Sequence, residues 1–113
     1  MEEQLVRFKT AKIAKEKGFN IHCIECYMPN GEETLDLDKR LSENNRIYAP
    51  TQSLLQKWLR EEHDVLVYVD PKSHHFFESH IITQDNEIIG DRGDNWEDVL
   101  EDGLYTALQE IKQ

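Results

Sequence analysis

Residues 65–83 read VLVYVDPKSHHFFESHIIT, and their composition predicts a β-hairpin. β-Branched and aromatic residues dominate Val65–Val69 and His75–Thr83, which are therefore expected to form strands. Asp70-Pro71-Lys72-Ser73 separates the two segments, and a proline presets a backbone dihedral that a turn requires. Because a hairpin joins antiparallel neighbours, this segment indicates an antiparallel sheet.

A second hairpin is predicted nearer the start of the chain. Ile21–Met28 has the composition of a strand, and Pro29-Asn30-Gly31 provides turn chemistry because asparagine and glycine tolerate a positive φ. The return strand is expected at Thr34–Asp38, where leucines alternate with aspartates. Residues 39–49 are expected to form a loop. Residues 87–89 are too few to decide whether they form a short edge strand.

Three helices are predicted around the hairpins. Leu5–Lys17 carries apolar residues along one side and ends before Gly18, which can take the left-handed conformation that closes a helix. A second helix is predicted from Thr51, a suitable N-cap, to His63. The third begins after Asn95, another suitable N-cap, and is the clearest of the three. Its residues form one continuous apolar face: Trp96, Val99, Leu100, Gly103, Leu104, Ala107, Leu108 and Ile111.

The predicted order of elements is helix, strand, strand, helix, strand, strand, helix. Local hairpins favour an antiparallel sheet, and helices placed between them favour a two-layer α+β fold over a doubly wound one. At 113 residues the chain has the length of one domain. We therefore expect a single α+β domain over residues 1–113, with a mainly antiparallel sheet of about four strands and three helices.

The charge and the hydropathy pattern limit the classes of partner. The chain has 13 Lys and Arg against 23 Asp and Glu, a formal net charge of −10. Phosphate backbones should repel it, so direct nucleic-acid binding is not expected. The first residues lack a basic region followed by an apolar one, and no apolar run approaches the ~20 residues of a membrane helix. We therefore expect a cytoplasmic protein that does not contact membranes.

Metal and nucleophile chemistry would depend on Cys23, Cys26 and the histidines. Thiolates and imidazoles are the usual zinc ligands. In a continuous strand over residues 21–28, however, side chains alternate between faces, so the two sulfurs would point apart. The same alternation separates His74 from His75. The chain also lacks a phosphate-binding glycine loop, a GxSxG elbow and an HExxH pair. No metal, cofactor or catalytic residue is predicted; the alternative is a small enzyme or ligand-binding domain that uses Cys23 or a histidine in a pocket.

A run of acidic residues is the most unusual surface feature of the sequence. Residues 85–102 are densely acidic, and Arg92 is the only Lys or Arg among them. Such a field would speed the encounter with a basic protein partner. The simpler alternative is a solvated helix face whose acids oppose the positive end of the helix dipole. The candidate binding residues are Asp91, Asp94, Glu97, Asp98, Glu101 and Asp102.

The predicted strands offer a second candidate surface because they carry apolar residues on both faces. If all the helices pack on one side, the other face exposes an aromatic patch that suits a protein partner or a homodimer. Its candidate contact residues are Tyr27, Tyr68 and Phe77. If a helix crosses to the far side, the same patch is core. The sequence therefore favours a non-enzymatic interaction or accessory module that acts through an acidic helix end or an apolar sheet face.

Three segments of the chain resemble a family of uncharacterised small proteins of gut bacteria and their phages or mobile elements. They are residues 10–19 (TAKIAKEKGF), 49–61 (APTQSLLQKWLRE) and 96–104 (WEDVLEDGL). Cys23 has a counterpart in that family, whereas an aromatic residue usually stands at the position of Cys26. The family has no assigned activity or cofactor. The resemblance implies an accessory protein of a bacterium or its phage.

Overall fold

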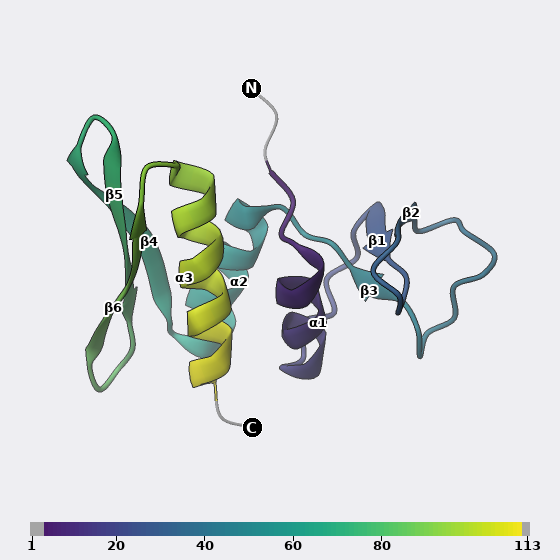
Figure 1. Ribbon diagram of the computed structural model, residues 1–113. Coiled ribbons are helices and arrows are strands. Elements are labelled where there is room, and N and C mark those ends of the chain that lie inside the picture. The colour runs from purple at the N-terminus through teal and green to yellow at the C-terminus, as the bar shows by residue number, and fades with distance from the viewer. Residues whose placement is uncertain (1–3, 112–113) are drawn as a thin grey trace.

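The computed structural model describes residues 4–111, which form three helices and two antiparallel sheets (Figure 1). The smaller sheet has the order β2-β1-β3, with short strands: β1 (Glu25–Tyr27), β2 (Glu33–Leu35) and β3 (Ile47–Tyr48). The larger sheet has the order β4-β5-β6, with longer strands: β4 (Leu66–Ser73), β5 (Phe76–Ile82) and β6 (Glu87–Gly93). The helices are α1 (Phe8–Glu16), α2 (Gln52–His63) and α3 (Trp96–Glu110).

The α+β class and the predicted order of elements are confirmed, but a single sheet of about four strands is wrong. Each hairpin gains a third strand that the sequence did not define. β3 is formed by two residues inside the segment expected to be a loop. β6 includes residues 87–89, for which the sequence did not decide a strand, and continues to Gly93 because these residues pair with β5.

The first hairpin turns where it was predicted, but its first strand is shorter than expected. Gly31 has φ +90°, and its N–H donates to the carbonyl of Met28 at 2.8 Å. Residues 21–24 are not part of a strand, and the chain bends at Ile24. Side-chain alternation therefore does not hold across both Cys23 and Cys26.

The turn predicted at residues 70–73 is wrong. β4 continues through Pro71, which pairs with Phe77, and the turn falls instead at His74 and His75. β4 is an edge strand of its sheet, where a proline removes no hydrogen bond to a neighbouring strand. The strand pairing of the residues around Pro71 thus outweighs the preference of proline for turns.

The helix caps follow the sequence, whereas the start of α1 does not. Thr51 accepts a hydrogen bond from the N–H of Leu54, and Asn95 accepts one from the N–H of Asp98. Gly18 closes α1 with φ +100°. α1 begins at Phe8 and not at Leu5, because Leu5 pairs with Thr51 in an isolated antiparallel bridge.

The larger sheet and α3 pack closely, and the contact sets which face of the sheet is buried. A Cβ atom placed on Gly103 would lie 2.9 Å from the Cβ of Ser79 on β5. The helix therefore approaches the strand at a distance that only glycine permits. The core continues from this layer into the smaller sheet, where Tyr27 and Ile47 are buried in the same cluster. Within residues 4–111, no helix is both long and apolar enough to cross a bilayer.

Candidate functional site

The helices α2 and α3 lie on one side of the β4-β5-β6 sheet, and within residues 4–111 no element covers the other side (Figure 1). Val67 and Ile81 point toward α3 and are buried. We call the opposite side the open face, because its side chains alternate with these buried ones along each strand. The residues of the open face are Leu66, Tyr68, Asp70, Lys72, Phe76, Glu78, His80, Ile82, Glu87, Ile89 and Arg92.

One half of the open face is apolar. Leu66 is opposite Ile82, and His80 lies between Tyr68 and Ile89 in the strand register. Leu66 is 39% exposed and Ile89 is 55% exposed, while Tyr68 and Ile82 are half-buried. The Tyr68 ring stacks on the His80 ring with centroids 5.0 Å apart. These side chains are neighbours in the strand register across all three strands, with Glu87 beside Ile82 at the end.

The other half of the open face is a charged network centred on Glu78, which is only 3% exposed. Arg92 Nε lies 2.6 Å from Glu78 Oε2, and His80 Nε2 lies 2.8 Å from Glu78 Oε1. Burial by itself would raise the pKa of Glu78. The hydrogen bond and charge of Arg92, helped by Lys72, outweigh burial and hold that pKa below its ordinary value.

Asp70 has its own counter-ion in the same network. Lys72 Nζ lies 3.0 Å from Asp70 Oδ2 and 3.6 Å from Glu78 Oε1. The hydrogen bond to Asp70 raises the pKa of Lys72. Asp70 and Glu78 are therefore balanced by Lys72 and Arg92, and the polar half of the open face has no excess of acid.

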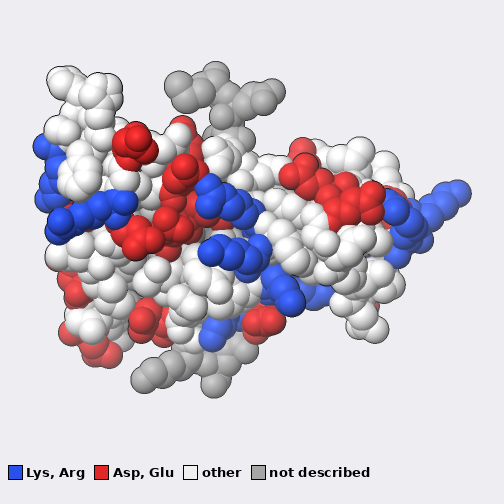
Figure 2. All heavy atoms as spheres, viewed as in Figure 1, with Lys and Arg blue, Asp and Glu red and all other residues white. Residues whose placement is uncertain are grey.

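The acidic residues predicted as a docking surface lie on β6, on the loop before α3 and on α3 itself. Figure 2 shows acidic side chains gathered over β6 and α3, with basic side chains beside them. Asp91, Asp94 and Asp98 are exposed. Asp98 forms an ion pair with Arg7, which compensates part of the acidic field. Glu97 and Asp102 are half-buried.

Glu101 is not part of that surface, which corrects the sequence hypothesis. The side chain is fully buried, and its Oε2 accepts a hydrogen bond from the N–H of Arg7 at 2.9 Å. Its Oε1 accepts one from Gln52 Nε2 at 3.2 Å. The helical period could have identified this position, because residue 101 lies on the same side of α3 as Leu104 and Leu108.

Asp91 and Asp102 form an unfavourable pair of like charges between β6 and α3. Burial raises the pKa of Asp102, and the neighbouring carboxylate of Asp91 raises it further. Arg7 and Lys9 act in the opposite direction but do not cancel these effects. The pKa of Asp102 therefore stays above its ordinary value, with burial as the main cause.

The three residues predicted to share an aromatic sheet face lie on different surfaces. Tyr68 is on the open face. Tyr27 belongs to the smaller sheet, where it is buried and its hydroxyl donates to the carbonyl of Val6 at 2.7 Å. Phe77 is on the covered side of the larger sheet and packs edge-on against Trp96, with centroids 5.6 Å apart. The hypothesis assumed one sheet, and the division into two sheets separates these residues.

The two cysteines are free and buried. Burial raises the pKa of the Cys23 thiol to about 11, and the nearby Cys26 and acidic side chains contribute to the rise. Burial also raises the pKa of Cys26. At neutral pH both remain protonated thiols, which are poor nucleophiles. Among residues 4–111, no group of three or more His, Cys, Asp or Glu side chains is arranged to hold a metal ion.

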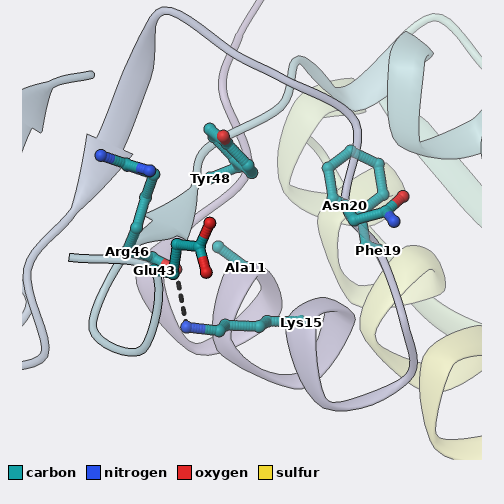
Figure 3. Close-up of a pocket in the computed structure, with 7 residues that line it drawn as sticks. All are labelled: Ala11, Lys15, Phe19, Asn20, Glu43, Arg46 and Tyr48. Carbon is teal, nitrogen blue, oxygen red and sulfur yellow. Dashed lines mark hydrogen bonds between the residues drawn. The ribbon is translucent and has the colours of Figure 1, made fainter. Parts of the chain in front are cut away.

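A cavity of about 250 Å³ lies between α1 and the segment that leads into β3 (Figure 3). Lys15 reaches across it, and its Nζ donates to the carbonyls of Asn44 at 2.9 Å and Arg46 at 2.7 Å. The lysine thus holds the loop against α1. The residues that line the cavity include neither a thiol nor an imidazole: Ala11, Lys15, Phe19, Asn20, Glu43, Arg46 and Tyr48.

A second cavity, of about 260 Å³, is lined by Cys26, which lies on the central strand β1 of the smaller sheet. Glu25 and Glu33 are beside it, and no histidine lines it. Neither cavity therefore brings a cysteine together with a histidine that could activate it. Comparison with known protein families, curated proteins and solved structures finds no match for this chain.

Proposed function

We propose that this chain is a non-enzymatic protein-interaction module that binds a protein partner through the open face. The observation that supports this proposal is the placement of α2 and α3 on one side of the β4-β5-β6 sheet, with Leu66 and Ile89 left exposed on the other. Continuous apolar patches on a surface commonly mark interaction sites. The setting that we propose is that of a cytoplasmic accessory protein of a bacterium or its phage, as the sequence resemblance implies.

The composition of the open face fits a protein partner. Protein interfaces combine an apolar centre with a polar rim whose groups are hydrogen-bonded. Here Tyr68 and Ile89 supply apolar and aromatic area, while Glu78 is already paired with Arg92. A charge that is paired before binding does not become an isolated buried ion when a partner covers it. Burial of this face therefore carries a small electrostatic penalty.

Site-specific photo-crosslinking tests the proposal. A photoreactive amino acid at Ile89 should crosslink to a protein when the chain is expressed in cells, and self-crosslinks count as a positive result. The matched control is the same amino acid at Leu37, which is 90% exposed and follows β2 of the smaller sheet. Crosslinks at Ile89 that are absent at Leu37 support the open face. Equal crosslinking at both positions, or none at Ile89, contradicts it.

The acidic surface supports a second candidate function, the binding of a basic protein partner. The observation in its favour is the pair Asp91 and Asp102, whose like charges are kept together although burial and proximity raise the pKa of Asp102. A lysine or arginine from a partner would relieve this repulsion.

Calorimetric titration with an oligolysine peptide tests this second function. Binding should weaken as salt is added and should weaken further on Asp91→Asn. The matched control is Glu16→Gln, which removes an exposed acid from α1. If the two variants weaken binding of the peptide equally, the interaction depends only on the net charge of the chain and not on the acidic surface.

A further inference from the structure

We propose that the partner of the open face is a second copy of this chain, packed face to face around a two-fold axis. This inference rests on the proposed function and names the occupant of the surface. Homo-oligomers with two-fold symmetry are the commonest soluble assemblies, and their interfaces use the same patch on both subunits.

The charge distribution favours the open face over other surfaces for self-association. Each copy has a net charge of −10, so two copies repel each other over most orientations. On the open face, Asp70 is paired with Lys72 and Glu78 with Arg92. Glu87 lies at the end of the face, level with Ile82, and its side chain is 49% exposed. The open face is thus a nearly neutral area on a strongly acidic molecule.

The strand register makes this face self-complementary. A two-fold axis that runs along β5 places β4 of one copy over β6 of the other. In this arrangement Tyr68 of one copy faces Ile89 of the other, since both lie level with His80 on β5. Asp70 of one copy faces Arg92 of the other, since both lie level with Glu78. Glu87 of one copy faces Leu66 of the other at the end of the contact, since both lie level with Ile82. Glu78 lies near the axis and meets its own copy, with Arg92 paired to each. Tyr68 and Ile89 thus supply the apolar contact, and Asp70 and Arg92 supply the opposite charges.

The packing is that of a two-layer sandwich, in which sheets lie roughly 10 Å apart. A face of three strands and about seven residues covers roughly 300 Å² per copy, from a rise of ~3.3 Å per residue and a strand spacing of ~4.8 Å. Stable complexes bury about 800 Å² per partner. The dimer is therefore expected to be weak and to depend on concentration.

The effect of salt distinguishes this dimer from binding of a basic partner. The two copies carry like net charge, so their long-range repulsion is screened by added salt. Self-association through the open face should therefore strengthen severalfold between about 20 mM and about 300 mM salt. Binding of a basic partner to the acidic surface should change in the opposite direction.

Sedimentation analysis of the purified full chain tests the inference at about 10 µM to 1 mM, the range suited to a small interface. We expect a monomer–dimer equilibrium that Ile89→Glu weakens at least about tenfold, because it places two unpaired charges in the contact. Leu66→Glu, on the same face, should act alike. Leu37→Glu adds the same charge on the smaller sheet and should leave the equilibrium within about twofold of the parent. Circular dichroism checks that each variant is folded.

A chain that remains monomeric at every concentration and salt level overturns the inference. Equal weakening by Ile89→Glu and Leu37→Glu also overturns it, because net charge alone would then be the cause. If the chain is monomeric but position 89 crosslinks to another protein, the second copy is wrong and the proposed function stands. If position 89 captures nothing as well, both fail.

Discussion

At the scale of single residues, Glu101 links three segments of the chain. Its carboxylate accepts hydrogen bonds from the backbone of Arg7, before α1, and from the side chain of Gln52, on α2. The residue itself is on α3 and is fully buried. A buried carboxylate is tolerated when donors satisfy its oxygens. Glu101 therefore fixes the position of α1 relative to the other helices.

Glu101→Ala should destabilise the fold by about 2–4 kcal/mol, because it removes the acceptor of the Arg7 N–H and one of the two acceptors of Gln52 Nε2, and opens a cavity. Urea unfolding followed by circular dichroism measures the change. Glu110→Ala, an exposed acid at the end of the same helix, should change stability by less than about 0.5 kcal/mol. Similar losses for both variants would show that burial of Glu101 has no special role.

The pH dependence of folding stability tests the environment of Asp102. Its pKa in the folded chain is raised above the ordinary value of 3.8, so the folded state holds the proton more tightly than the unfolded state. This contribution to stability is present at low pH and is lost as the pH rises from 3.8 through the raised value.

Asp102→Asn should therefore raise the free energy of unfolding at pH 7 by about 0.5 kcal/mol, a small gain because solvent screens the pair. The gain should disappear near pH 3. Thermal unfolding at both pH values measures it, with Asp85→Asn, an exposed loop acid, as the control. A gain that is equal at the two pH values would rule out relief of the carboxylate repulsion.

At the scale of secondary structure, the elements defined by local chemistry were the predictable ones. The caps Thr51 and Asn95 and the closing glycine Gly18 depend on side chains within a few residues of each other. β3 is only two residues long and depends on pairing with β1, earlier in the chain. β6 pairs with the adjacent strand β5, but most of its residues are polar or glycine, so its own composition does not indicate a strand. Pro71 illustrates the same limit, because its place in β4 depends on β4 being an edge strand.

The contact between α3 and β5 supplies the test at this scale. Gly103→Ala would normally favour a helix by about 1 kcal/mol. Here the added Cβ would lie 2.9 Å from the Cβ of Ser79, so we expect a net loss of about 1–3 kcal/mol in urea unfolding. Adding Ser79→Gly should recover part of the loss by removing the opposing atom. Stabilisation by Gly103→Ala would show that the helix can move away from the sheet freely.

At the scale of the whole molecule, the two sheets differ in what covers them. The larger sheet is covered by α2 and α3 on one side, while its open face remains accessible. Of the three aromatic residues predicted to mark a binding surface, only Tyr68 lies on the open face. The period of each strand shows that its residues fall on two faces, but the side taken by the helices is set by the long-range connections between the elements.

The prediction of an acidic docking surface had the same limit, because composition does not show which distant residues pair in the fold. Composition identified the run of acids, and Asp91, Asp94 and Asp98 are indeed exposed. Composition could not show that Arg7, far away in the sequence, pairs with Asp98. Nor could it show that the polar half of the open face balances its own charges. The neutral area of this acidic molecule emerges only when the strands are paired.

The most direct test of self-association through the open face is a methyl NMR spectrum recorded over a range of protein concentrations, from about 20 µM to about 1 mM. The methyl signals of Leu66, Ile82 and Ile89 should shift as concentration rises. Those of Ile24, Leu35 and Leu37, which are also exposed but belong to the region of the smaller sheet, should stay in place. Shifts confined to the second group, or no concentration dependence in the first, would contradict self-association through the open face.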